Sequence, residues 1–247
     1  MRTANPALNS RTFTSLPYVS DTSQVMTLQG TVNKTLALLL TTILVASYTW
    51  GKAVSWDPSS ALPWMLGGMI GGFIVAMVTV FNPQAARWSA PLYAILEGLF
   101  LGGISAIFEQ SYPGIVFQAV SLTFGTALCL LLAYKSRLIK PTENFKLGVV
   151  SATGGIALLY FISLILGLFH VNVPFIHQGG TFGIIFSIIV VVVAALNLVL
   201  DFDFIESGAA QGAPKYMEWY SAFGLLVTLV WLYIEILRLL AKLRERR

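Results

Sequence analysis

Residues 180–206 read GTFGIIFSIIVVVVAALNLVLDFDFIE, an apolar run that ends in acids. A spanning helix needs about 20 mostly apolar residues, so the run predicts a transmembrane helix. Asn197 and Asp201 stack on one face of it near its end, and Asp203 and Glu206 continue the polar character outwards. An ionised carboxylate at the centre of a bilayer costs about 2.5–3.5 kcal/mol on insertion scales, so an acid near that depth faces protein or water. Asp201, the deepest of these acids, is therefore the first candidate functional residue.

The rest of the chain has the composition of an integral membrane protein. Apolar residues make up 56% of the 247, charged residues make up 11%, and the mean hydropathy is +0.77. A soluble domain carries about 25% charged residues. The basic residues cluster at the ends of the apolar runs, as membrane insertion requires, so nucleic acid is not an expected partner. The single cysteine, Cys129, excludes disulfides and cysteine-based metal sites.

Seven apolar runs predict seven transmembrane helices that span the lipid bilayer. Turn-forming residues separate most of them, and a basic loop from Lys135 to Lys146 separates the fourth from the fifth. We expect an all-α membrane protein in which residues 31–247 form the transmembrane domain. Residues 1–30 are polar and lack apolar periodicity, which is typical of a flexible tail. The seven runs are 32–51, 62–81, 89–109, 114–134, 147–169, 180–206 and 219–242.

The basic residues also predict an orientation. Most lysines and arginines of the internal loops lie on the side of the N-terminus, which favours a cytoplasmic N-terminus. The basic C-terminal segment from Arg238 to Arg247 argues the other way, because seven spans place it outside. We follow the loops and expect a cytoplasmic N-terminus, because several loops agree. The alternative is that one run is not a span, or that the seventh helix is re-entrant, which would put both termini inside.

Small residues predict close helix packing. Gly67 to Gly72 contains two overlapping pairs of glycines four residues apart, and Gly98 and Gly102 form another. Such spacing lets helix backbones approach closely in a membrane.

Two further acids lie inside apolar runs. Glu97 is about halfway along its run, and no residue nearby on that helix neutralises it, so it is either protonated or paired with another helix. Glu235 and Arg238 are three residues apart, which predicts an intrahelical ion pair. His170 and His177 lie in a loop and are either inert or sensors of pH. The chain has no Walker-type loop, dinucleotide fingerprint or HExxH motif, so we expect neither an enzyme nor a bound cofactor.

The chain resembles the Bax inhibitor-1 and YccA-like membrane proteins, most closely their bacterial branch, over about residues 30 to 243. The resemblance rests on the sixth run, which ends Leu-Asp201-Phe-Asp203-Phe-Ile205, and on the seventh, which contains Leu-Tyr-Ile-Glu235-Ile-Leu-Arg238-Leu-Leu. It implies six helices packed around a central seventh in a bacterial inner membrane. It also implies a pH-sensitive calcium leak gated by an acidic pair, with one acid on the sixth helix and one on the seventh.

Only some of the gate residues that the resemblance implies have a matching residue in this sequence. Asp201 matches the acid of the sixth helix. On the seventh helix, alignment on Arg238-Leu-Leu places Thr228 at the expected position, whereas alignment on Leu-Tyr-Ile-Glu235 restores an acid seven residues further along. Glu97 and Glu235 are thus alternative second carboxylates, and Asp201 with Glu97 is the candidate calcium site.

The resemblance supplies a mechanism and an alternative to it. Two carboxylates in a desolvated site hold a shared proton; its loss at higher pH separates the helices, and Ca²⁺ takes the place of the proton. Asn197 and Asp203 join this gate, and Arg87 is the candidate for a basic latch on an early helix. The alternative is a regulator or substrate of a membrane-bound AAA protease, with residues 1–30 as the handle.

Overall fold

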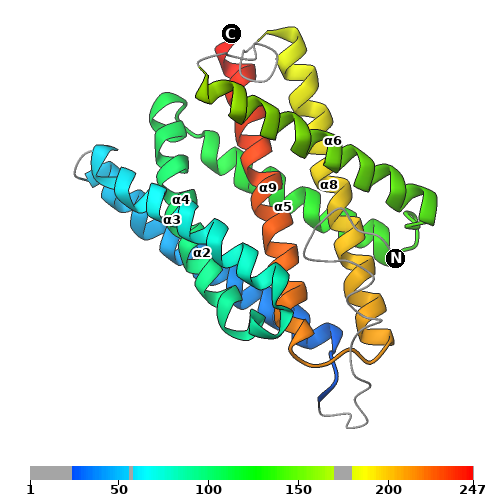
Figure 1. The fold of residues 1–247 in the computed structure, drawn as a ribbon. Coiled ribbons are helices and arrows are strands. Elements are labelled where there is room, and N and C mark those ends of the chain that lie inside the picture. Colours follow the sequence, from blue (N-terminus) through cyan, green and yellow to red (C-terminus); the bar gives the residue numbers. More distant parts are fainter. Residues whose placement is uncertain (1–23, 56–57, 170–179, 247) are drawn as a thin grey trace. The chain divides into compact units, whose positions relative to one another are not determined.

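The computed structural model describes residues 24–55, 58–169 and 180–246, and nearly all of them are helical (Figure 1). Seven helices are long and apolar enough to cross a membrane, and the described residues contain no strand, which confirms the expected all-α fold. Residues 1–23 of the expected tail and the two loop histidines, His170 and His177, lie outside the described residues. The helices are α2 (Leu28–Ser55), α3 (Pro58–Phe81), α4 (Ala86–Ser111), α5 (Ile115–Lys135), α6 (Glu143–Leu168), α8 (Thr181–Ala210) and α9 (Met217–Glu245), with a 3-10 turn, η2 (Pro83–Ala85), before α4.

Five helices, α2, α3, α4, α6 and α9, begin earlier than the apolar runs predict. α6 begins at Glu143 rather than at residue 147, because the side chain of Thr142 accepts a hydrogen bond from the Phe145 N–H at 3.3 Å and caps the helix. α2 begins at Leu28 rather than at residue 32. The hydropathy of a run therefore locates a span but not the polar turn in front of it.

The described residues form two compact units. The α6 unit contains α5, α6, the part of α8 up to Asp203 and the part of α9 from Thr228. The α4 unit contains α2, α3, η2 and α4, together with the end of α8 and the start of α9.

In the α4 unit, glycines allow α4 to pack closely against α2 and α3, which Figure 1 shows as neighbours. A Cβ added at Gly98 of α4 would lie 2.7 Å from the carbonyl oxygen of Thr42 on α2. A Cβ added at Gly68 of α3 would lie 2.5 Å from the carbonyl oxygen of Leu96 on α4. Both distances are too short for a side chain, so the predicted close packing is confirmed at Gly68 and Gly98, whereas a Cβ at Gly67 would meet nothing within 4 Å.

The residues just before α2 pair with the connection between α8 and α9, in the α4 unit. The Met26 N–H donates to the Ala213 carbonyl at 2.6 Å, and the Lys215 N–H donates to the Gln24 carbonyl at 2.8 Å. The chain is thus held from Gln24 onwards, whereas the sequence placed the whole of 1–30 in a flexible tail.

Glu218 strengthens this attachment. Its side chain is 1% exposed and accepts hydrogen bonds from the Thr27 N–H and the Thr27 hydroxyl, both at 2.9 Å. Lys34 forms an ion pair with the same carboxylate. A Cβ at Gly30 would overlap this carboxylate, so a side chain there would displace Glu218 from its partners. One buried acid therefore joins the start of α2 to the start of α9.

In the α6 unit, α6 and α8 meet in an apolar cluster. Ile156 of α6 packs with Val190 and Val193 of α8, and Trp231 of α9 packs against them. Polar side chains before and after these apolar residues in the sequence also join α6 to α8 and α9. They make up most of the candidate site.

Candidate functional site

The three acids near the end of α8 differ in depth. Asp201 is 0% exposed, whereas the Asp203 side chain is 17% exposed and Glu206 is exposed. This is the order that the sequence predicted, since Asp201 lies furthest inside the apolar run. Asp201 and Asp203 are two residues apart and so point to sides of α8 that differ by about 200°. They therefore meet different neighbours.

Asn197, one turn before Asp201, joins α8 to α6. It is 2% exposed, and its Nδ2 donates to the Thr153 hydroxyl of α6 at 2.8 Å and to the Val193 carbonyl of α8 at 2.8 Å. A buried amide with both N–H groups bonded avoids the cost of unsatisfied donors. Asn197 is thus part of the contact between the two helices.

A buried ion pair that the sequence did not indicate forms a second contact between α6 and α8. Lys146 Nζ lies 2.8 Å from Asp203 Oδ2 and 3.3 Å from Glu143 Oε1. The Lys146 side chain is only 6% exposed, and a buried ammonium needs such carboxylates close by. The sequence placed Lys146 at the end of a basic loop, but the structure places it inside α6.

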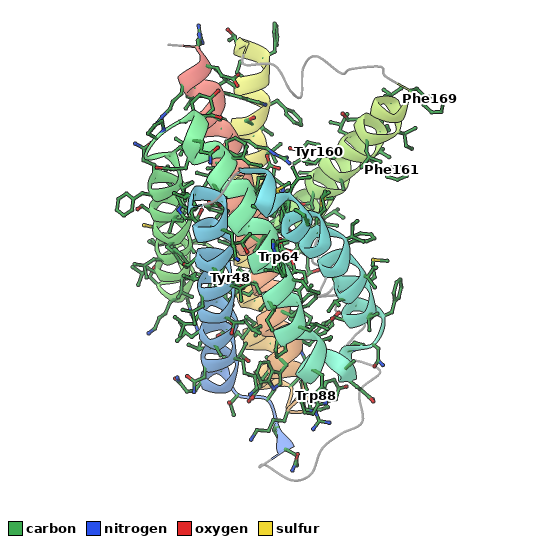
Figure 2. The ribbon with its side chains drawn as sticks, turned by 90° about the vertical axis from the view of Figure 1, so that its left-hand side faces the viewer. Tyr48, Trp64, Trp88, Tyr160, Phe161 and Phe169 are labelled. Atoms are coloured by element: carbon green, nitrogen blue, oxygen red, sulfur yellow. The ribbon has the colours of Figure 1, made fainter. Side chains whose placement is uncertain are left out.

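Glu235 of α9 lies in a cluster of polar side chains in the same unit. Figure 2 labels Tyr160 on α6. The Tyr160 hydroxyl lies 3.0 Å and 3.1 Å from the two carboxylate oxygens of Glu235. Arg238 Nη1 lies 3.3 Å from Glu235 Oε1, which confirms the predicted intrahelical pair, and its guanidinium lies 5.8 Å from the centre of the Tyr160 ring. Glu235 is 2% exposed, and Thr228, seven residues before it, is also buried.

Glu97 lies in the α4 unit and is 8% exposed. The sequence indicated no neutralising residue nearby on its own helix, but the structure supplies a hydrogen-bond donor there, because the Tyr93 hydroxyl one turn before it bonds to the carboxylate. A Cβ at Gly72 of α3 would lie 3.3 Å from Glu97 Oε2, so the carboxylate packs against α3 at a glycine. The Tyr93 ring in turn lies 4.9 Å from the Phe223 ring.

The structure groups the predicted site residues by unit. The α6 unit holds five of them: Asn197, Asp201, Asp203, Thr228 and Glu235. Glu97 and Arg87 belong to the α4 unit, where Arg87 is exposed and its guanidinium lies 5.9 Å from the Trp88 ring. The second acid of the gate and the latch role of Arg87 both stay predictions.

Three side chains of α6 were missed by the sequence reasoning: Lys146, Thr153 and Tyr160. Their partners are 57, 44 and 75 positions away in the chain (203 − 146 = 57 for the first), so no local pattern pairs them. Their spacing of seven residues was the available signal, because it places all three on one face of a helix.

Calcium is the permeant ion that the resemblance implies. Among residues 24–55, 58–169 and 180–246, no group of three or more His, Cys, Asp and Glu side chains is placed to hold a metal ion. Contact of calcium with Asp201 and Glu97 stays a prediction.

A comparison with protein families identifies the family of this chain. The family model described as Bax inhibitor 1 like matches residues 5–245, nearly the whole chain. The chain belongs to the Bax inhibitor 1 like family. Comparisons with curated proteins and with solved structures found no match. Membership in the Bax inhibitor 1 like family confirms the resemblance seen in the sixth and seventh helices, and the protein is a multi-pass membrane protein of that family.

Proposed function

We propose that this protein is a pH-sensitive calcium leak of the membrane and that Asp201 is the acid on which its gating depends. The observation that supports this proposal is the complete burial of Asp201 in an apolar helix of a Bax inhibitor 1 like protein. Intramembrane acids are costly and mark ion or proton pathways by default.

The mechanism follows from the two protonation states of Asp201. Protonated Asp201 is neutral and is compatible with its buried place on α8. Deprotonated Asp201 carries a charge that requires water or a cation, so loss of the proton at higher pH favours a rearrangement that admits both. Calcium prefers carboxylate and carbonyl oxygens and is a suitable counter-ion. Glu97 and Glu235 remain the alternative second acids.

The test is calcium flux into liposomes that carry the purified protein, measured from pH 5 to 8. We expect the wild-type flux to rise with pH and the Asp201→Asn flux to lose this dependence, because the amide has no proton to release in this range. Glu206→Gln is the matched control, since it removes an exposed acid from the same helix. Identical pH profiles of wild type and Asp201→Asn would contradict the proposal.

The alternative role, as a regulator or substrate of a membrane-bound AAA protease, stays a prediction. No contact among the described residues favours it over the leak. Absence of calcium flux from the wild-type protein at every pH would make it the preferred role.

A further inference from the structure

One face of α6 carries a regular stripe of polar and apolar side chains. Lys146, Thr153 and Tyr160 recur every seven residues, and the buried Val149 and Ile156 lie between them. The three polar positions extend over about 21 Å along the helix, a large part of the thickness of a bilayer. Lys146, Val149 and Ile156 are the residues found buried within 143–167, and all three lie on this stripe, so it is the main surface by which α6 is held.

Each polar position of the stripe meets a polar side chain of another helix. Lys146 pairs with Asp203 of α8 at 2.8 Å, and Thr153 accepts from Asn197 of α8 at 2.8 Å. Tyr160 donates to Glu235 of α9. Two of the three contacts therefore reach α8, and they do so close to Asp201.

The two contacts on α8 bracket Asp201. Asn197 is four residues before it and points about 40° away around the helix axis, whereas Asp203 is two residues after it and points about 200° away. A rotation of α8 that moved Asp201 from its buried place would have to break the Asn197 contact, the Asp203 contact, or both. α6 thus resists that rotation from two positions.

We propose that Lys146 and Thr153 of α6 are positioning residues for Asp201, which hold α8 in the rotation that keeps this acid buried. This inference rests on the proposed function and names the residues that set its gate. The charged groups that face Lys146 are Asp203 from α8 and Glu143 from its own helix. Loss of the Lys146 ammonium leaves the Asp203 charge without its partner, which favours exposure of this end of α8.

The experiment compares the pH profile of calcium flux for variants of α6 in liposomes. Lys146→Met and Thr153→Val each remove one contact, and we expect a several-fold higher leak from both at the acid pH values where the wild type is closed. Lys146→Arg keeps the charge and should retain the wild-type profile. Lys140→Met is the matched control, because it removes an exposed lysine six residues earlier.

A charge swap adds a stricter criterion. Lys146→Asp combined with Asp203→Lys restores the pair in the opposite sense, and it should return the profile towards that of the wild type if the contact matters. Thr153→Val changes only a hydroxyl to a methyl group, so it keeps the inference testable where Lys146→Met fails to fold. Folded protein is verified by its elution from a size-exclusion column before reconstitution.

The outcomes separate this inference from the proposed function. A pH-dependent wild-type leak that Asp201→Asn alters, but that folded Lys146→Met and Thr153→Val leave unchanged, overturns the inference and leaves the function standing. No leak from the wild-type protein overturns both. A raised leak at acid pH in either contact variant, with a normal profile for Lys140→Met, supports the inference.

Discussion

Glu218 illustrates at the scale of one residue how a buried charge organises this fold. It lies in the first turn of α9, where a negative charge is favoured by the helix dipole, and it also satisfies the Thr27 N–H in front of α2. Lys34 supplies the opposite charge. These partners offset the cost of burying the Glu218 charge. Removal of the carboxylate would therefore leave several polar groups without a hydrogen-bond partner.

We expect Glu218→Gln to lower the stability of the protein by about 1–3 kcal/mol, because the buried amide leaves Lys34 without its anion and replaces charged hydrogen bonds by neutral ones. The measurement is thermal unfolding in detergent together with hydrogen exchange at the Met26 and Lys215 amides, which should become faster. Glu206→Gln removes an exposed acid and serves as the control. Equal melting temperatures and equal exchange for the two variants would show that the Glu218 contacts are dispensable.

The residue scale also separates what the sequence predicted from what it did not. The relative depth of Asp201, Asp203 and Glu206 was predicted, because depth follows from the position of a residue within an apolar run. The intrahelical pair of Glu235 and Arg238 was predicted for a similar reason, since its spacing is local. The partners from α6 were not predicted, because contacts between helices depend on how those helices pack and not on the pattern of either one alone.

At the scale of elements, α4 is the helix whose packing depends most clearly on small residues. Gly98 and Gly102 lie against the backbone of α2, and Gly68 of α3 lies against the backbone of α4. Without a hydrophobic driving force between helices in lipid, this close approach supplies the van der Waals contact that holds them together. The seven spans themselves were predicted because length and apolarity are local properties, whereas the cap at Thr142 was not.

We expect Gly98→Ala to destabilise the α4 unit by about 1–3 kcal/mol, because the new methyl group overlaps the Thr42 carbonyl and forces α2 away. Gly51→Ala, on α2, is the matched control, since a Cβ there meets nothing within 4 Å. It should be neutral or stabilising by about 0.5–1 kcal/mol, as alanine is favoured over glycine inside a helix. Both values come from thermal unfolding in the same detergent, and a loss at Gly51 equal to that at Gly98 would refute the steric explanation.

At the scale of the whole molecule, the part of the chain that the structure describes has seven helices able to cross a membrane. Seven crossings would put the two ends of the membrane domain on opposite sides. The basic C-terminal segment argued against a cytoplasmic N-terminus, yet two of its cations bind protein groups. Lys242 is 8% exposed and donates to the Gly183 carbonyl and the Ser187 hydroxyl, and Arg244 donates to Gln118. These cations have a role inside the α6 unit, so they weigh less in the choice of orientation.

We therefore expect single cysteines, introduced into a Cys129→Ser background, to report opposite sides in intact bacterial cells. A membrane-impermeant thiol reagent should label Arg246→Cys from outside but should reach Gln211→Cys, in the exposed connection between α8 and α9, only after permeabilisation. The reverse pattern would mean an inverted protein. Labelling of both positions from one side would mean that α9 does not span the membrane.

The bond between Thr27 and Glu218 has a consequence for biogenesis. Its two residues are 191 positions apart. At about 5–20 residues per second, a ribosome needs roughly 10–40 s to make the intervening chain. The first span is therefore made well before Glu218, the residue that binds the start of α2. During that interval the start of α2 is accessible to chaperones, proteases and incorrect partners. Its bond to Glu218 can form only after the beginning of α9 has been synthesised.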